Sequence, residues 1–272
     1  MFWVVFFQKP YFAVFAPKCA AARAKRRLIV ENAKGKITLV LFDLDGTLLP
    51  MDQELFIKAY FGGIAARLAP RGYETQALIK AIWTGTGAMV KNDGLTTNES
   101  AFWKAFSAVY GPKAMEDEPY FDQFYREDFD GIKKVCGFTA ESDRIIKLIR
   151  GAGVRVALAT NPIFPAIAAQ KRMAWAGLDR NDFELVTTYE NSSFCKPNLK
   201  YYEEILKKLS CCPEECLMVG NDVGEDMVAK NLGMKVFLLT DGLINKSGED
   251  LSAYPHGTFK DLEEYLKKYV LA

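Results

Sequence analysis

Residues 37–47 read Ile-Thr-Leu-Val-Leu-Phe-Asp-Leu-Asp-Gly-Thr, and this stretch carries the most information about the fold. Its first six residues are almost entirely apolar, which is typical of a strand buried on both faces in a parallel sheet. Two acids, Asp43 and Asp45, follow at once, with Gly46 and Thr47 behind them. A turn closed by Asp45 and Gly46 explains only part of this pattern. An acid directly after a buried strand indicates a small polar site at the end of that strand.

Apolar runs of the same kind recur along the rest of the chain, at residues 154–159, 183–187, 216–220 and 235–239. Stretches with helical spacing of apolar residues lie between them, at 139–151, 163–177 and 199–209. Thr139 is placed to cap the first of these helices. Strands that alternate with helices predict an α/β fold, a doubly wound (Rossmann-like) parallel sheet with helices on both faces.

One long interval breaks this alternation between the first strand and the second. Residues 51–69, 74–91, 98–110 and 119–134 all read as helices with apolar stripes. The last carries Tyr120, Phe121, Phe124, Tyr125 and Phe129, which are more typical of the core of a small bundle than of a ligand cage. We therefore predict an α/β core domain from residues 36–50 and 136–272, with an inserted α-helical domain over 51–135. Such an insertion would lie over the carboxyl ends of the strands, where open α/β sheets bind ligands.

The first 35 residues are predicted to form an extension outside the fold. Residues 1–16 are strongly apolar, but the run is interrupted and falls short of the ~20 residues that a membrane-spanning helix needs. Six basic residues and no acid lie within residues 1–30. Two other interpretations stay open: a peripheral membrane tether through residues 1–30, and an organelle-targeting leader.

Charge and composition exclude several classes of function. The chain has 35 Lys and Arg against 34 Asp and Glu, and six of the bases lie in the first 30 residues, so the remainder is net acidic. A net acidic body offers no general field for nucleic acid. The single histidine, His256, lies in residues 254–257, which read as a surface loop. One histidine cannot build a histidine zinc site, so catalysis must use carboxylates, hydroxyls, lysine or a metal held by oxygen.

The six cysteines are too few to staple a chain of 272 residues. Cys211, Cys212 and Cys216 place three sulfurs within six residues, but their spacing is not C-x-x-C and no fourth ligand lies near. Ordinary reduced thiols of a cytoplasmic protein are the better interpretation.

Polar residues also follow the later strands. Thr160, Asn161 and Pro162 end the second strand and lead into a helix, which suits an anion, and Lys196 precedes the next helix. The 216–220 strand ends in Gly-Asn-Asp-Val-Gly-Glu-Asp, where a helix starting at once would place Asp222 and Asp226 on one face. Clustered with Asp43 and Asp45, these acids would form an oxygen-only cation site, which favours Mg²⁺.

These four pieces, in this order and each at the end of a predicted strand, resemble the motifs of the haloacid dehalogenase superfamily of phosphohydrolases. The resemblance covers residues 37–270. Residues 43–47 match the first motif, Thr160 the second, Lys196 the third, and Asp222 with Asp226 the fourth. The helical insertion is similar to the C1-type cap of that superfamily, which closes over the active site.

The resemblance implies a role for each matching residue. Asp43 is expected to attack phosphorus and form an aspartyl-phosphate, with Asp45 as general acid and then general base. The phosphoryl oxygens of the substrate are expected to bind to Thr160, Asn161 and Lys196. Mg²⁺ is expected on Asp43, the backbone carbonyl of Asp45, Asp222 and Asp226.

The expected activity is Mg²⁺-dependent hydrolysis of a small phosphorylated metabolite. Dehalogenase members lack an aspartate at the place of Asp45, so its presence indicates phosphoryl transfer. A sugar-type phosphomutase keeps the same four motifs and remains an alternative, as does a non-catalytic relative that binds a phosphometabolite. The sequence carries no signal for the particular ester or for the oligomeric state.

Overall fold

The structure, a computed structural model, describes residues 36–271. From Ile37 onward the chain forms one compact unit. The predictions for residues 1–35, including the extension and the tether, lie outside the described residues. Across the described part of the chain, no helix combines the length and the apolar composition needed to cross a bilayer.

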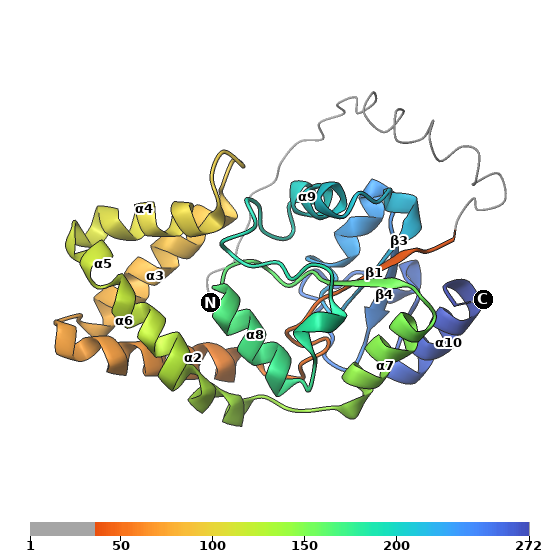
Figure 1. Ribbon diagram of the computed structural model, residues 1–272, viewed down its shortest axis with the longest axis horizontal. Coiled ribbons are helices and arrows are strands. Elements are labelled where there is room, and N and C mark those ends of the chain that lie inside the picture. The colour runs from red at the N-terminus through yellow and green to blue at the C-terminus, as the bar shows by residue number, and fades with distance from the viewer. Residues whose placement is uncertain (1–35, 272) are drawn as a thin grey trace. The chain divides into compact units, whose positions relative to one another are not determined.

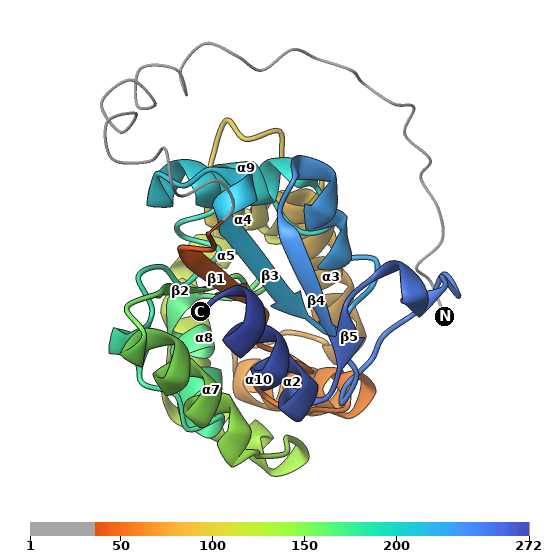
Figure 2. The same ribbon diagram turned by 90° about the vertical axis from the view of Figure 1, so that its right-hand side faces the viewer.

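Five parallel strands form one sheet in the described residues (Figure 2). Their bounds are β1 Leu39–Phe42, β2 Arg155–Leu158, β3 Cys216–Gly220, β4 Lys235–Leu239 and β5 His256–Gly257. The order across the sheet is β2-β1-β3-β4-β5, which confirms the predicted parallel α/β sheet. Phe42 at the end of β1 lies opposite Leu158 of β2 and Val219 of β3. The carboxyl ends of these three strands therefore meet at one edge of the sheet.

Helices cover both faces of this sheet, as Figure 2 shows. The helices of the core are α7 Ala140–Gly151, α8 Ala166–Trp175, α9 Leu199–Leu209 and α10 Phe259–Tyr269, with short 3₁₀ turns η4 Arg180–Asp182, η5 Pro213–Glu215, η6 Met227–Leu232 and η7 Leu251–Ala253. Val40 and Phe42 of β1 pack with α7, α8 and α10, whereas Leu39 and Leu41 pack with α9. This alternation follows from the two-residue period of a strand.

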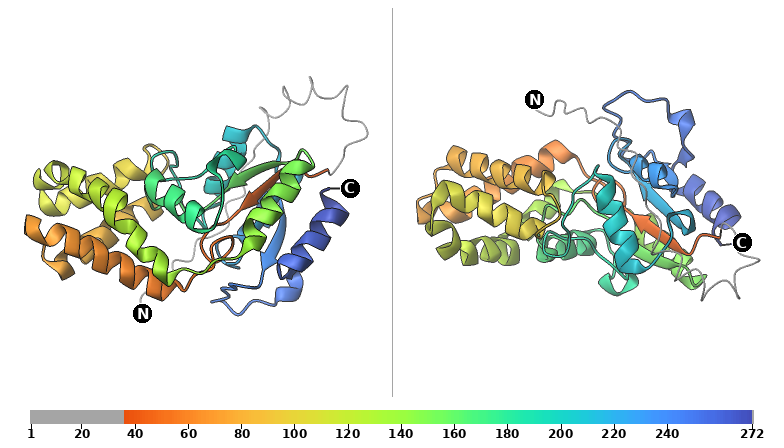
Figure 3. Two further views of the ribbon diagram at one scale, coloured as in Figure 1. Left: turned by 60° about the horizontal axis from the view of Figure 1, so that its bottom comes forward. Right: turned by 90° about the horizontal axis from the view of Figure 1, so that it is seen from above.

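The interval between β1 and β2 is helical, as predicted. It contains α2 Gln53–Leu68, η1 Ala69–Arg71, α3 Thr75–Val90, α4 Asn98–Tyr110, α5 Lys113–Glu116, α6 Glu118–Gln123, the π-helix η2 Phe124–Asp128 and the 3₁₀ helix η3 Phe129–Val135. These elements gather away from the sheet, with α3 and α4 packed against each other (Figures 1 and 3). Phe121, Phe124, Tyr125 and Phe129 are buried among them, which confirms the predicted aromatic core.

Two neighbouring stretches of chain join this insertion to the sheet. Met51 and Cys136 form an isolated antiparallel bridge, and the Gly137 N–H donates to the Pro50 carbonyl at 2.7 Å. The chain therefore leaves the sheet and returns to it at one place. The predicted boundaries of a core domain and an inserted domain remain a prediction.

Three local predictions were wrong, and one predicted helix has a different winding. Residues 183–187 lie beside β2 and exchange three backbone hydrogen bonds with Val156 and Leu158, but they form a single bridge, between Leu158 and Val186, and no continuous strand. Residues 119–134 form three successive helical pieces, because the ring-rich segment winds to bury its aromatic face. The loop around His256 contains β5, a two-residue edge strand. Residues 222–226 form a turn, and the following 3₁₀ helix begins only at Met227.

Candidate active site

The predicted polar site lies where β1, β2 and β3 end. Backbone hydrogen bonds continue the sheet one residue beyond β1: Asp43 N–H donates to Val219 at 2.9 Å, and Ala159 N–H donates to Phe42 at 2.7 Å. These bonds hold the loops that follow the three strands against one another. Asp43 is 7% exposed and Thr160 is 2% exposed. The site is therefore built on rigid strand ends and largely shielded from water.

Lys196 lies at the centre of the site. Its side chain is 1% exposed, and its ammonium Nζ lies 2.7 Å from Asp43 Oδ1 and 2.6 Å from Asp226 Oδ1. A buried ammonium is costly unless it is paired, and two carboxylates pair it here. Burial alone would lower the pKa of Lys196, but the charges of Asp226 and Asp43 raise that pKa well above its ordinary value. The lysine is therefore held as a cation, and the set of two acids and one base keeps an excess negative charge.

The other oxygen of Asp43 is held by the end of its own motif. Thr47 Oγ1 lies 3.1 Å from Asp43 Oδ2 and 2.8 Å from Asn221 Oδ1. Gly46 between them has φ +86°, and an added Cβ would lie 2.4 Å from Asn221 Nδ2, so a side chain here would meet both strain and a clash. This explains why the sequence has glycine and threonine directly after its two acids.

Asp45 has a partner that the sequence pattern did not indicate. Its Oδ2 forms an ion pair with Arg172 of α8, whose side chain is 1% exposed. Asp45 Oδ1 is buried and has no hydrogen-bond partner among the described residues. Burial raises the pKa of Asp45, and the Arg172 guanidinium acts against this rise. Asp45 thus has one oxygen anchored and one oxygen available.

The loops after β2 and before α9 meet through Asn161. The Lys196 N–H donates to Asn161 Oδ1 at 3.3 Å, and Asn161 Nδ2 donates to Glu225 Oε2 at 3.1 Å. The Thr160 carbonyl accepts from Tyr201 Oη at 2.9 Å, which fixes the loop from the side of α9. The structure therefore brings Asn161 and Lys196 together as predicted, although α8 begins five residues after Asn161 rather than directly behind it.

The acids after β3 are divided between two tasks. Asp222 Oδ1 accepts from Gly224 N–H at 2.8 Å and from Glu225 N–H at 3.0 Å, so this side chain closes its own turn. Asp226 Oδ2 accepts from Asp222 N–H at 3.0 Å while its Oδ1 binds Lys196. Burial raises the pKa of Asp226, and Lys196 acts against that rise. Glu225 also reaches the site, and burial raises the pKa of its carboxyl. The spacing of the acids after β3 did not indicate this residue.

The four predicted metal ligands do not converge as side chains in the described residues. Asp43 and Asp226 meet at Lys196, Asp45 pairs with Arg172, and Asp222 binds its own turn. No group of three or more His, Cys, Asp or Glu side chains among residues 36–271 is arranged to hold a metal ion. The donors at the site are nevertheless carboxylate and carbonyl oxygens, and the excess negative charge suits a hard cation.

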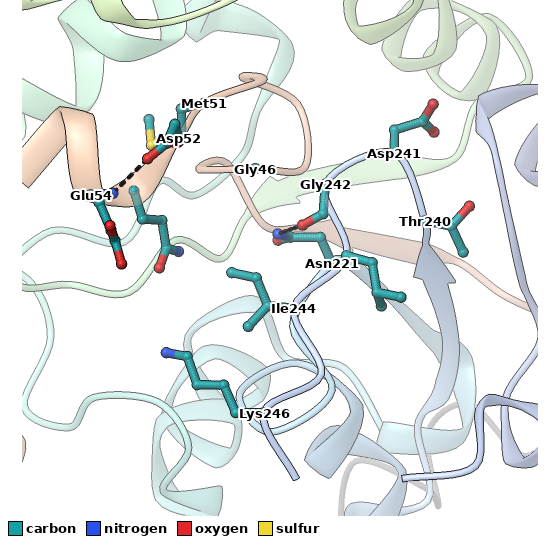
Figure 4. Close-up of a pocket in the computed structure, with 12 residues that line it drawn as sticks. Gly46, Met51, Asp52, Glu54, Asn221, Thr240, Asp241, Gly242, Ile244 and Lys246 are labelled. Atoms are coloured by element: carbon teal, nitrogen blue, oxygen red, sulfur yellow. Dashed lines mark hydrogen bonds between the residues drawn. The ribbon is translucent and has the colours of Figure 1, made fainter. Parts of the chain in front are cut away.

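A pocket of about 550 Å³ adjoins the Gly46 turn (Figure 4). The start of α2 lines one side of it and residues 240–246 line the other. Asn221 connects the pocket to the polar site, because its Oδ1 accepts from Thr47 of the site and its Nδ2 donates at 2.6 Å to the carbonyl of Gly242, which lines the pocket. Asp43 and Lys196 do not line this pocket. The pocket and the cluster of Asp43, Lys196 and Asp226 are therefore separate features, connected through Asn221 and Thr47.

Known proteins resemble this chain along most of its length. A family model of haloacid dehalogenase-like hydrolases matches residues 37–242. The phosphoglycolate phosphatase of Colwellia psychrerythraea is 31% identical over 229 residues, which are 84% of this chain and 95% of that protein. The glyceraldehyde 3-phosphate phosphatase of Methanothermobacter thermautotrophicus is 30% identical over 112 residues, and the match spans 38% of this chain and about half (48%) of that relative.

A solved structure shares the fold. The crystal structure of 2-haloacid dehalogenase from Pseudomonas syringae pv. Tomato DC3000 superposes with a TM-score of 0.56. It is 17% identical and covers 86% of this chain and all of that one. The likeness extends over both the sheet and the helical insertion.

Proposed function

Because this chain belongs to the haloacid dehalogenase-like hydrolases and is a phosphatase, we propose that it hydrolyses small phosphate monoesters through a covalent intermediate on Asp43. The observation that carries this proposal is the buried Lys196 ammonium between Asp43 and Asp226, at the point where three strands end. A phosphate ester is an anion, and a nucleophilic carboxylate is repelled by it unless a cation is fixed beside both.

Asp43 is the proposed nucleophile. A carboxylate oxygen of Asp43 attacks phosphorus, the bond from phosphorus to the ester oxygen breaks, and an aspartyl-phosphate forms. Lys196 and Thr47 each contact one oxygen of Asp43, so the carboxylate is oriented before the substrate arrives. Water then attacks the phosphorus, releases phosphate and restores Asp43.

Asp45 is the proposed general acid and base. It gives a proton to the leaving oxygen in the first step and takes one from the attacking water in the second. Arg172 holds Oδ2, which leaves the partnerless Oδ1 as the proposed atom for proton transfer. With a single, exposed histidine in the chain, no imidazole is available for this work.

The proposed phosphoryl-oxygen ligands are Thr160, Asn161 and Lys196. Thr160 and Asn161 follow β2, and the backbone N–H of Lys196 is bound to Asn161, so the three belong to one connected group. Charge that builds on the phosphoryl oxygens during transfer is stabilised by fixed donors of this kind.

Mg²⁺ is the proposed cofactor, because the available donors are oxygens only and carry excess negative charge. Asp43, the backbone carbonyl of Asp45, Asp222 and Asp226 would hold it. When bound, the ion shields the negative charge of Asp43 from that of the substrate. To bind the ion, Asp222 would have to give up its hydrogen bonds to Gly224 and Glu225. A substitution of Asp222 that lowers the affinity for Mg²⁺ would show that it is a metal ligand and not only a turn residue.

The proposed substrates are small phosphorylated metabolites of the cytoplasm, selected by the helical insertion acting as a cap. The insertion is joined to the sheet at Met51 and Cys136, directly beside the strand ends. A cover of this kind leaves room for small esters and excludes phosphoproteins. The names of the relatives suggest 2-phosphoglycolate and glyceraldehyde 3-phosphate as the first compounds to test.

The experiment measures phosphate release from those two compounds and from 4-nitrophenyl phosphate, with Mg²⁺ and with a chelator. The wild-type chain is compared with Asp43→Asn and with Asp122→Asn, which changes an exposed acid of α6 in the insertion. We expect Asp43→Asn to lower turnover by at least about 1,000-fold, as loss of a nucleophile does, and Asp122→Asn to leave it unchanged. Chelation is expected to abolish turnover, and added Mg²⁺ to restore it.

Borohydride reduction of the enzyme during turnover supplies a direct readout of the intermediate. Reduction of an aspartyl-phosphate converts the aspartate to homoserine, and mass spectrometry locates the change. We expect it at Asp43. Equal turnover by folded Asp43→Asn, or reduction at another residue, would overturn the mechanism.

A further inference from the structure

Asn98 of the helical insertion is completely buried, which is unusual for an asparagine near a helix start. Its amide nitrogen Nδ2 lies 3.2 Å from the Pro162 carbonyl, 3.4 Å from the Phe194 carbonyl and 3.4 Å from Cys195 Sγ. These three acceptors belong to two different loops of the core. One side chain of the insertion therefore reaches both loops.

The backbone of α4 strengthens the same contact. The Asn98 N–H donates to the Ser192 carbonyl at 2.8 Å, and the Glu99 N–H donates to the Tyr189 carbonyl at 2.9 Å. Donors in the first turn of a helix have no partner within the helix, and here the core supplies it. Figure 3 shows the start of α4 beside the segment that runs from α8 to α9. The end of the helix is completed by a loop of the core.

The tip of the α3–α4 hairpin also lies against this loop. An added Cβ at Gly94, whose φ is +92°, would lie 2.3 Å from the ring of Phe194. Only glycine permits this close approach without displacing the ring. Asn92 Nδ2 donates to Asn98 Oδ1 at 3.0 Å, so the hairpin tip also holds the acceptor end of the buried amide.

The partners of Asn98 are the immediate neighbours of proposed phosphate ligands. Pro162 follows Asn161, and Cys195 precedes Lys196. Asn161 and Lys196 are themselves joined by a hydrogen bond of 3.3 Å. Any displacement of α4 therefore acts on the two loops whose next residues are Asn161 and Lys196.

We propose that Asn98 is a positioning residue that ties the helical insertion to the phosphate-binding loops, so that Asn161 and Lys196 are correctly placed only while the insertion is docked. Separation of the insertion would leave the Asn98 amide nitrogen and two helix N–H groups without their partners in the core, and water would have to replace those partners. This assignment rests on the proposed function, because it takes Asn161 and Lys196 as phosphate ligands. It assigns to a residue of the insertion a role in phosphate binding that does not require contact with the substrate.

The test compares Asn98→Ala with Thr97→Ala, its neighbour. Thr97 caps α4 through Ser100 N–H at 3.2 Å and contacts neither loop in the hydrogen bonds described here, so its loss weakens the helix start without disturbing the loops. Asn98→Ser is a second variant, which keeps a polar group too short to reach both loops. The probe is inorganic phosphate, measured in the presence of Mg²⁺ as a competitive inhibitor and by calorimetric titration. Thermal unfolding of each variant is recorded alongside.

We expect Asn98→Ala to raise both the inhibition constant and the dissociation constant of phosphate about tenfold, the effect of losing one well-placed hydrogen-bond network. KM is expected to rise by a similar factor, and kcat to change less. Thr97→Ala is expected to lower the unfolding temperature while leaving phosphate binding unchanged. If Asn98→Ala does not fold, Asn98→Ser decides, with an expected effect in the same direction.

The two proposals fail in different ways. Phosphate binding by folded Asn98 variants equal to that of Thr97→Ala, with an active wild type, would overturn the positioning role alone. Absence of phosphatase activity in the wild type would overturn the proposed function. Weaker binding that merely follows the loss of thermal stability in all three variants would also overturn the positioning role.

Discussion

Arg172 and Asp45 show how one buried contact decides the chemistry available at a residue. Without a partner, the buried Asp45 carboxylate would be strongly disfavoured, and Arg172 supplies that partner at Oδ2. The guanidinium is itself enclosed, with the ring of Phe164 at 4.7 Å and the Ala168 carbonyl at 3.2 Å. The guanidinium cannot turn toward water, so it is held against the partly buried Asp45 and fixes the orientation of that carboxylate.

Arg172→Met is predicted to affect esters according to their leaving group. An alkyl phosphate needs a proton on its leaving oxygen, and misplacing the general acid costs on the order of 100-fold or more. 4-Nitrophenyl phosphate leaves without that help, so its hydrolysis is expected to fall much less. The measurement is the ratio of kcat/KM for the two esters, with Arg172→Lys expected to retain part of the alkyl rate.

The matched control for this prediction is Arg144→Met, which removes an arginine from the surface of α7. Arg144 forms ion pairs with Glu141 and Glu263, and none of these three residues is a proposed site residue. We expect it to change neither rate. An equal loss on both esters in folded Arg172→Met would show that the arginine acts through the structure rather than through Asp45.

Cys211 is predicted to be alkylated more readily at neutral pH than Cys136 and Cys195. A hydrogen bond from Cys216 lowers the pKa of Cys211 to about 7, aided by Arg155 Nη1 at 2.8 Å from its sulfur. The thiolate is the nucleophile, so a lower pKa means more reactive sulfur at lower pH. The rate with iodoacetamide, followed by peptide mass spectrometry, is expected to be half-maximal near pH 7.

Two other cysteines of the same chain provide the comparison. Burial raises the pKa of Cys136 to about 11 and that of Cys195 to about 12. Both are expected to stay unreactive across the pH range in which Cys211 is labelled. Arg155→Gln is expected to move the midpoint of Cys211 upward, and a midpoint above pH 9 in the wild type would contradict the prediction.

At the scale of the element, the helices of the core follow their local signals closely. Thr139 caps α7 as predicted, with its Oγ1 3.3 Å from the Glu141 N–H, and the helix ends at Gly151. The isoleucines at 145, 146 and 149 are fully buried on the face toward the sheet. Because the capping residue and the apolar face both indicate the same helix, the bounds of α7 could be predicted from local sequence alone.

Thr139→Ala is predicted to lower the free energy of unfolding by about 1 kcal/mol, the usual effect of removing a helix cap. Urea denaturation measures it. Thr84→Ala is the matched control, because the Thr84 hydroxyl donates to the Lys80 carbonyl in the middle of α3, where alanine is a better helix former. The control is expected to be neutral or slightly stabilising. Identical losses in the two variants would mean that the cap contributes nothing of its own.

The helical insertion is less local in origin. The segment after α6 passes from an α-helix through a π-helix to a 3₁₀ helix, and these changes of winding keep Phe124 and Phe129 buried. A periodic apolar pattern predicts that a helix exists but does not specify its winding. The winding depends on the rings that the segment meets, which here are those of α2 and the Trp175 ring of α8.

At the scale of the whole molecule, every proposed site residue belongs to the compact unit that begins at Ile37. A chain that starts at Lys36 is therefore predicted to fold and to retain turnover within about twofold of the full chain, in line with the small effects of changes remote from a site. Phosphate release and thermal unfolding of the two forms test this. A loss of turnover beyond tenfold in the shortened chain would show that residues 1–35 contribute to catalysis.

Much of the arrangement could be predicted from the sequence, because it depends on local patterns. A buried strand reads as an apolar run, so β1, β3 and β4 were located nearly to the residue. Parallel strands place their carboxyl ends at one edge, so Asp43 and Thr160 were expected together, whereas Lys196 was placed with them only through the family resemblance. The 183–187 run shows the limit of such patterns, since it does pair with β2 through backbone hydrogen bonds but forms one bridge and no continuous strand.

The sequence by itself determined which residue types stand at the ends of the strands, because motif order and strand order are properties of a linear chain. Only the tertiary structure decided which groups face them. Arg172 lies within the helix predicted over 163–177, Asn98 begins the helix predicted over 98–110, and neither belongs to a motif. Each acquires its role from partners 64 or more positions away, Asp45 for the arginine and Pro162 and Cys195 for the asparagine. Contacts at that separation depend on how helices and loops far apart in the chain pack together, and no local sequence pattern specifies which polar side chains they bring into contact.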